Sequence, residues 1–257
     1  MEQAVARAAL ETGLRLLGLD RGMEVEVHSS LIKFGRIEGG AATVVDALIS
    51  VVSPAGTIVM SAYPLSRGEP LTGQDVARGI TYKSRVLPGN SPERTNLGAV
   101  VDEFRLRPDV QCGTSIHRSA VWGANAEPHL EGYSRLLADE GKALLLGVGI
   151  GNLSSMHVPE HTVGIPKEIQ ALSALPPDIL RDYPEDQWYV ECDRVKGPPD
   201  ADPWGAVWRE AVSAGFIKTG RIGNAECHFF TASDVVGIYE RRLRTDPWSL
   251  FGVPKPA

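Results

Sequence analysis

The sequence has few cysteines, and they do not follow the spacings that bind a structural metal. Cys112, Cys192 and Cys227 are isolated from one another, and no CxxC pair occurs. A secreted disulfide framework or a zinc ribbon needs several thiols at regular or close spacing. We therefore expect a reduced, cytoplasmic protein without a structural zinc site.

Long apolar runs and an excess of positive charge are also missing. There is no apolar run of the length that spans a bilayer, and Met1 is followed by an Ala/Glu/Arg/Leu stretch rather than a signal peptide. The formal net charge of the 257 residues is −6, and lysine and arginine are spread along the chain. Because nucleic-acid binding depends on clustered positive charge, we expect neither a nucleic-acid partner nor a membrane span.

Several enzyme signatures are absent. The chain contains no G-x-S-x-G nucleophile elbow and no G-x-x-x-x-G-K-[ST] phosphate loop. Residues 147–151 read GVGIG, but this spacing is not that of a dinucleotide-binding loop. His157 and His161 lie in H-V-P-E-H rather than H-E-x-x-H. Pro159 can lie in the first turn of a helix but not inside a regular helix that carries both histidines. We therefore predict that the protein binds no metal.

Hydrophobic periodicity predicts helices that alternate with strands along most of the chain. We expect helices over 3–18, 41–52, 96–106, 127–140, 203–215 and 232–243, and strands over 24–27, 57–62, 119–122, 143–148 and 227–231. Residues 63–96 are interpreted as a long loop, and the proline-rich residues 165–205 as a small lobe with short strands such as 188–190. The alternation favours an α/β sandwich, with a single domain over residues 1–257.

Residues 141–160, GKALLLGVGIGNLSSMHVPE, form the most informative stretch. A buried strand is expected to end in a glycine-rich loop that carries His157, with Glu160 three residues later. Three residues along a helical turn place two side chains on one face. A neutral histidine held by a carboxylate can accept a proton near pH 7. Because open α/β sheets bind ligands at the ends of their strands, we predict His157 and Glu160 as catalytic residues.

A second stretch of interest begins with V-H-S-S-L at residues 27–31 and continues through Lys33 and Gly35 to Gly39-Gly40. The backbone N–H groups at such a helix start can hold a phosphate or pyrophosphate. The alternative is an ordinary strand–turn–helix crossover, in which the glycines only allow tight packing. The residues alone leave both readings open.

Four blocks of the sequence resemble the aminoglycoside N3-acetyltransferases, a family distinct from the GCN5-related acetyltransferases. The third block, residues 141–160, matches the family's GRxLLLGV…TSLHxAE pattern almost without gaps. The other blocks are residues 27–60, with HSSL, GG and GTIVM, residues 94–105, with RTNLG and EFR, and residues 220–247, with GRIGNA, DVV and DP. Together they span about residues 5–251.

This resemblance implies a three-layer α/β/α sandwich with a mixed central sheet. It also implies acetyl-CoA as the donor and an amine of an aminoglycoside antibiotic as the acceptor. Within it, His157 is the residue that activates the amine, and Glu160 is its carboxylate. The residues expected on the CoA side are Ser29, Ser30, Leu31, Lys33, Gly35, Thr95, Asn96 and Ser154.

The sequence departs from the family pattern where an acceptor would be recognised. Residues 114–118 read TSIHR where the family often shows H-P-x-H-S, and Ile150 and Gly151 replace a usual His-Asp. We predict Tyr63, His117 and Arg118 as substrate-binding residues. Two alternatives stay open, namely acylation of a different amine, such as a natural-product biosynthetic intermediate, and a non-catalytic ligand-binding protein. A homodimer is also left open.

Overall fold

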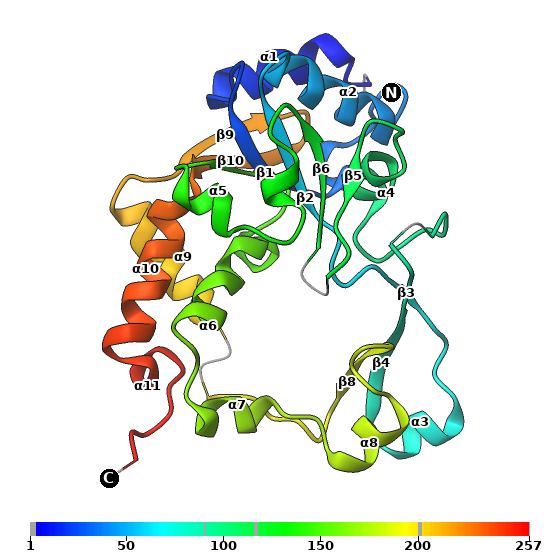
Figure 1. Cartoon of the computed structure of the whole chain (residues 1–257), viewed down its shortest axis with the longest axis vertical. Coiled ribbons are helices and arrows are strands. Elements are labelled where there is room, and N and C mark those ends of the chain that lie inside the picture. The colour runs from blue at the N-terminus through cyan, green and yellow to red at the C-terminus, as the bar shows by residue number, and fades with distance from the viewer. Residues whose placement is uncertain (1–3, 90, 116–117, 200–201, 257) are drawn as a thin grey trace.

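The computed structural model describes residues 4–89, 91–115, 118–199 and 202–256. Its main body is built around a seven-stranded mixed sheet with the order β5-β6-β2-β1-β7-β10-β9 (Figure 1). The strands are β1 (Glu24–Ser29), β2 (Thr57–Ser61), β5 (Gln111–Cys112), β6 (Ser119–Gly123), β7 (Lys142–Leu146), β9 (Lys218–Ile222) and β10 (Ala225–Thr231). β1 pairs in parallel with β2 and β7, and the outer strands pair antiparallel.

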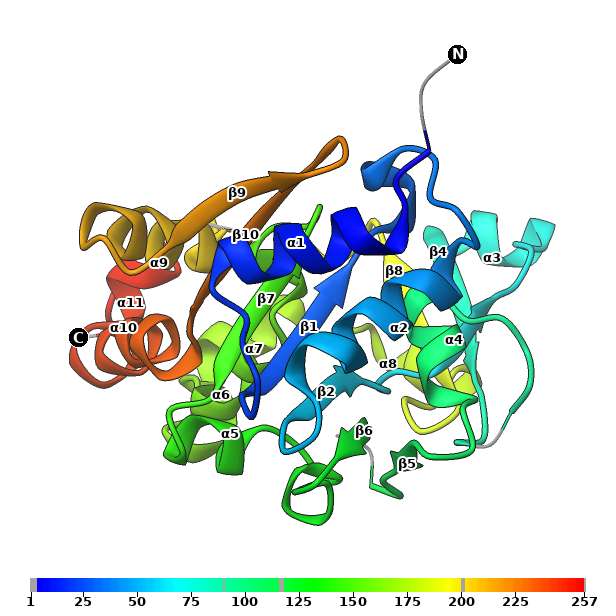
Figure 2. The same ribbon diagram turned by 90° about the horizontal axis from the view of Figure 1, so that it is seen from above.

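Helices cover both faces of this sheet (Figure 2). The first face carries α1 (Arg7–Leu17), α2 (Ala41–Val52) and α4 (Ala99–Arg105), and the second carries α5 (Ser134–Ala138), α6 (Val158–Thr162), α9 (Pro203–Ser213), α10 (Ala232–Thr245) and α11 (Pro247–Leu250). Successive side chains of a strand point to opposite faces. Accordingly, Leu144 and Leu146 of β7 join the core on the first face, whereas Ala143 and Leu145 join the core on the second. The predicted three-layer α/β/α sandwich is confirmed.

A small lobe stands apart from the sheet of the main body (Figure 1). It holds the three-stranded sheet β3 (Ser66–Gly68), β4 (Ile80–Val86) and β8 (Trp188–Cys192), together with α3 (Gly73–Ala77) and α8 (Pro177–Asp182). The helix α7 (Lys167–Ser173) leads into the lobe, and its Ile169 packs in the core of the second face. The lobe was predicted from residues 165–205 alone. Residues 63–96 were expected to be a loop, and that prediction is wrong, because β3, α3 and β4 come from this segment.

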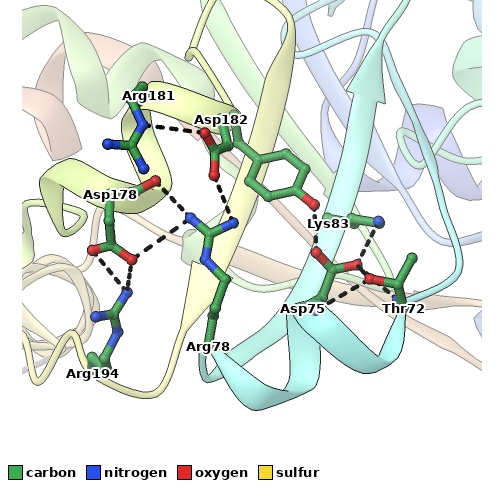
Figure 3. A network of polar contacts seen from close by, with 9 residues as sticks. Thr72, Asp75, Arg78, Lys83, Asp178, Arg181, Asp182 and Arg194 are labelled. Atoms are coloured by element: carbon green, nitrogen blue, oxygen red, sulfur yellow. Dashed lines mark hydrogen bonds and ion pairs between the residues drawn. The ribbon is translucent and has the colours of Figure 1, made fainter.

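Buried charge holds the lobe together, because its apolar core is small. Asp75 on α3 is 1% exposed, and its Oδ2 lies 2.6 Å from Nζ of Lys83 on β4 (Figure 3). The hydroxyl of Tyr183 and the backbone N–H and hydroxyl of Thr72 also donate hydrogen bonds to this carboxylate. Burial alone would raise the pKa of Asp75, but the hydrogen bonds from Lys83, Tyr183 and Thr72 outweigh it and lower the pKa well below its usual range.

Arg78 adds a second polar contact between the two segments of the lobe. Its guanidinium donates to the backbone carbonyl of Asp178, 2.6 Å away, and lies 2.9 Å from the Asp182 carboxylate on α8 (Figure 3). The ion pair of Arg194 with Asp178 is more exposed, and such surface pairs add little stability. The lobe therefore joins residues that lie about a hundred positions apart in the sequence.

The residues that the structure describes also form four short 3-10 helices: η1 (Leu31–Phe34), η2 (Glu127–His129), η3 (Ile150–Asn152) and η4 (Ser154–His157). The helix predicted over 127–140 is interrupted, with η2 and α5 separated by Gly132 at a φ of 129°. This φ lies in the region that favours glycine. Within the described residues, no helix combines the length and apolarity needed to cross a bilayer.

Candidate active site

The three parallel strands end at one edge of the central sheet, and their loops meet there. Ser29 at the end of β1 is in register with Leu146 at the end of β7, and Ser61 ends the neighbouring β2. Loops that follow parallel strands at the carboxyl edge form the ligand sites of open α/β sheets. The segments that leave this edge carry Tyr63 and His157, two of the predicted site residues.

Gly147 directs the chain from β7 into the loop that carries the histidine. Its φ is 71°, a region that side chains other than glycine rarely adopt, and its N–H donates to the carbonyl of Glu226 at 2.9 Å. A Cβ at this position would lie 2.6 Å from Cβ of Lys33. Only glycine lets β7 turn here beside the segment that follows β1.

His157 and Glu160 form the polar pair that the sequence predicted. His157 ends η4 and is the N-cap of α6, and Pro159 lies in the first turn of α6, where proline is tolerated. Nδ1 of His157 lies 2.6 Å from Oε2 of Glu160. The histidine side chain is 55% exposed and the glutamate side chain 21%. The imidazole therefore faces solvent on one side and a carboxylate on the other.

Two aromatic residues on helices of the second face contact this pair. The hydroxyl of Tyr239 on α10 donates to Oε1 of Glu160 at 2.9 Å. The ring of Trp204 on α9 meets the His157 ring edge to face, with centroids 4.8 Å apart. Sequence reasoning missed both residues, because an aromatic residue on an amphipathic helix looks like an ordinary core position.

A buried contact between Glu26 and His28 fixes the loop after β7 to the central sheet. Nε2 of His28 on β1 lies 2.7 Å from Oε1 of Glu26, and the backbone N–H of Ser155 donates to the same oxygen at 3.1 Å. Glu26 is fully buried in the sheet. This contact ties η4, and with it His157, to the end of β1.

His157 lies where two hollows adjoin. The larger, about 500 Å³, is called the Tyr189 hollow, and the smaller, about 290 Å³, the Asn96 hollow. The Tyr189 hollow is lined by Ser61, Tyr63, Pro64, Glu131, Gly132, Tyr133, Ser134, Ser154, His157, Val158, His161, Thr162 and Tyr189. The Asn96 hollow is lined by His28, Ser29, Ser61, Tyr63, Pro64, Asn96, Leu97, Val101, Gly151, Asn152, Leu153, Ser154, His157 and Trp204.

The residues predicted on the CoA side divide into three groups. Ser29, Asn96 and Ser154 line the Asn96 hollow. Thr95 uses its hydroxyl to donate to Oδ1 of Asp102 at 2.8 Å, close to the start of α4. The remaining four, Ser30, Leu31, Lys33 and Gly35, belong to the turn after β1 and are not among the residues that line either hollow.

The predicted substrate-binding residues also differ in their position relative to the two hollows. Tyr63 lines both hollows. Arg118 lines neither, and its guanidinium donates to the backbone carbonyl of Leu87 at 3.1 Å. His117 lies outside the described residues.

The Tyr189 hollow carries one firmly ionised carboxylate. The Ser115 hydroxyl and the backbone N–H groups of Thr114 and Ser115 hydrogen-bond the carboxylate of Glu131 and lower its pKa to about 2. Burial raises the pKa of Tyr133, so this residue stays a neutral phenol. Among the described residues, no cluster of His, Cys, Asp and Glu side chains could hold a metal ion.

Comparison with known proteins gives concordant matches over nearly the whole chain. The family model described as aminoglycoside 3-N-acetyltransferase matches residues 27–244. Aminoglycoside N(3)-acetyltransferase III of Salmonella sp is 30% identical over 267 residues, covering 90% of this chain and 88% of the relative. The prophage-derived aminoglycoside N(3')-acetyltransferase-like protein YokD of Bacillus subtilis (strain 168) is 26% identical and covers 91% of both chains.

Solved structures share the fold. The aminoglycoside acetyltransferase AAC(3)-IVa apoenzyme superposes with a TM-score of 0.71 at 22% identity, covering 98% of this chain and 92% of that one. AAC-IIIb in a binary complex with CoASH superposes with a TM-score of 0.68 at 22% identity, covering 99% and 100%.

Proposed function

Because this chain belongs to the aminoglycoside 3-N-acetyltransferase family, we propose that it acetylates an amino group of an aminoglycoside, with His157 as the general base and Glu160 as its supporting carboxylate. Membership confirms the resemblance seen in the sequence. It makes the chain an N-acetyltransferase whose co-substrate is acetyl-CoA.

The observation that carries the proposal is the position of His157 between the two hollows. A transfer that relies on one general base needs the donor and the acceptor within reach of that base. In this proposal the thioester end of acetyl-CoA enters the Asn96 hollow, beside Ser29, Asn96 and Ser154. The acceptor enters the Tyr189 hollow. Holding the two reactants together removes much of the entropic cost of their encounter.

The chemistry then follows from the protonation states. An alkyl amine is mostly protonated at neutral pH and cannot attack a thioester until it loses a proton. Nδ1 of His157 faces Glu160, so Nε2 is the nitrogen free to accept that proton. The amine nitrogen forms a bond to the acetyl carbonyl carbon, the carbon–sulfur bond breaks, and the CoA thiolate leaves and takes up the second proton that the nitrogen loses. The Ser154 hydroxyl or a backbone N–H beside it is the proposed donor to the developing oxyanion.

A second candidate keeps this chemistry and changes the acceptor to another amine, such as a biosynthetic intermediate. Glu131 is the one carboxylate among the described residues that line the Tyr189 hollow, and three tyrosines line it with Glu131. A hollow with so much aromatic surface also suits an amine that carries fewer positive charges than an aminoglycoside.

The test is an acceptor panel with release of the CoA thiol as the readout. The wild-type protein should acetylate at least one aminoglycoside, and His157→Ala should lower turnover by about 10²-fold or more while CoA binding and folding survive. A preference for a non-aminoglycoside amine would support the second candidate. Near-normal turnover in His157→Ala would refute the assignment of the base.

A further inference from the structure

We propose that Tyr239, supported by Trp204, is a positioning residue that fixes the orientation and charge of Glu160 and thereby selects which nitrogen of His157 acts as the base. The inference rests on the proposed function of His157. It adds two residues from a separate part of the chain to a pair that the loop after β7 supplies.

Both oxygens of the Glu160 carboxylate are engaged, each by a different partner. Oε2 lies 2.6 Å from Nδ1 of His157, and Oε1 accepts the Tyr239 hydroxyl at 2.9 Å. A carboxylate held at both oxygens cannot rotate away from the imidazole. A glutamate that is held at one oxygen only keeps more of its rotamer freedom.

The Tyr239 hydroxyl can serve only as a donor to Glu160. Its side chain is fully buried, and burial, with the negative charge of Glu160 as a further cause, raises the pKa of Tyr239 above its usual value. The phenol therefore stays protonated over the working pH range. With Oε1 taken by the phenol, Oε2 is the oxygen left to accept from His157, and the tautomer of the imidazole that donates to it is the one with the proton on Nδ1. Nε2 is left bare and available.

Trp204 completes the arrangement from α9. Its ring meets the His157 ring at 66° with centroids 4.8 Å apart and the Tyr239 ring at 79° with centroids 6.2 Å apart. Edge-to-face contacts of this kind are favourable and restrict the ring plane. The Trp204 ring on α9 therefore contacts both the imidazole and the Tyr239 ring on α10.

Other titratable groups lie around His157 and must be considered in any pH profile. His161 and Glu160 come from α6 and Tyr239 from α10, while Tyr63, Glu131 and Tyr133 line the adjoining hollow. Of these, Glu160 makes the 2.6 Å contact with the imidazole. Tyr239→Phe changes the charge distribution on that contact and leaves the other groups in place.

The test compares Tyr239→Phe with the matched control Tyr183→Phe. Each variant removes one phenol-to-carboxylate hydrogen bond, but Tyr183 donates to Asp75 in the lobe and lines neither hollow. In Tyr239→Phe we expect kcat to fall about tenfold, with KM for acetyl-CoA unchanged within a few-fold. Tyr183→Phe should keep kcat within about twofold of wild type.

The acid limb of the pH profile provides the readout that a merely structural role would not move. Without the Tyr239 donor, negative charge on Glu160 concentrates at the oxygen that faces His157, which favours the imidazolium form. The acid limb of kcat/KM should therefore move to higher pH by about half a unit. An unchanged profile and rate in folded Tyr239→Phe would overturn the proposal.

A failure of the proposed function can be distinguished from a failure of this inference. The ring resonance of His157, assigned by its loss in His157→Ala, can be followed by NMR without any substrate. Its titration midpoint should rise in Tyr239→Phe and stay unchanged in Tyr183→Phe, even if no amine in the panel is acetylated. Identical titrations in both variants and in wild type would refute the positioning role.

Discussion

At the scale of single residues, the negative charge of Glu160 distinguishes His157 from an ordinary surface histidine. Glu160→Gln tests this charge and preserves shape, because the amide oxygen can still accept from Nδ1 and the amide N–H can donate to the Tyr239 hydroxyl. We expect turnover to fall about tenfold, less than for His157→Ala, since orientation survives and the stabilisation of imidazolium does not. Steady-state kinetics on the best acceptor measures both variants. A larger loss in Glu160→Gln than in His157→Ala would contradict the assigned roles.

Residue-scale reasoning from the sequence found this pair because it is local. A spacing of three residues places His157 and Glu160 together whatever the rest of the chain does. Tyr239 is 79 positions from Glu160, and no short-range pattern connects them. The same limit applies to Trp204, which reaches the site only because α9 packs beside α10.

At the scale of elements, the turn after β7 determines where the histidine loop begins. Gly147→Ala places a Cβ at positive φ and 2.6 Å from Cβ of Lys33, so we expect a loss of about 2 kcal/mol in the free energy of unfolding and reduced activity. Gly149→Ala is the matched control, because its φ is −98° and nothing lies within 4 Å of the added Cβ. In chemical denaturation, the free energy of unfolding of Gly149→Ala should lie within about 0.5 kcal/mol of wild type. Its turnover should match that of the wild type. Equal effects in both variants would contradict this account.

Element prediction succeeded where periodicity is local and failed where pairing is distant. The helix expected over 41–52 is α2, since its apolar residues repeat at helical spacing within one segment. Residues 63–96 show weak periodicity because β4 exists as a strand through pairing with β3 on one side and β8 on the other. β8 begins about a hundred residues after β4, so sequence patterns within 63–96 could not reveal the strand that pairs with β4 on its other side.

At the scale of the whole molecule, the buried Asp75–Lys83 pair determines whether the lobe stays folded. Asp75→Asn leaves the Lys83 charge buried without its counter-ion, so we expect the local stability of the lobe to fall by about 3 kcal/mol. Hydrogen exchange in β4 and β8 should accelerate while β1 and β7 keep their protection. Arg194→Gln is the control, because its exposed pair with Asp178 should be worth less than about 1 kcal/mol.

The same pair gives the lobe a defined pH dependence. The pKa of Asp75 is lowered in the folded state, so its ionised form contributes stability above the ordinary carboxyl pKa of about 4. That contribution is lost progressively as pH falls below this value. Protection of β4 and β8 should therefore weaken in acid in the wild type, and this slope should be absent from Asp75→Asn. Matching slopes in the two proteins would rule out Asp75 as the source.

A further prediction for the whole molecule is that turnover does not depend on a metal ion. Because the sequence contains no ligand set with the spacing of a zinc site, we expect turnover after chelator treatment and dialysis to stay within about twofold of the untreated rate. Activity that disappears with the chelator and returns with added zinc would show that a metal site had been overlooked.

The sequence by itself indicated an α/β sandwich of alternating helices and strands and the His157–Glu160 pair. Both depend on short-range regularities, namely apolar periodicity within one element and the geometry of a single helical turn. Tertiary structure alone decided that residues 63–96 join the lobe expected from residues 165–205, that Tyr239 contacts Glu160, and that His157 lies between two hollows. These features arise from contacts between residues far apart in the chain, and their partners become known only when the sheet order and the helix layers are fixed.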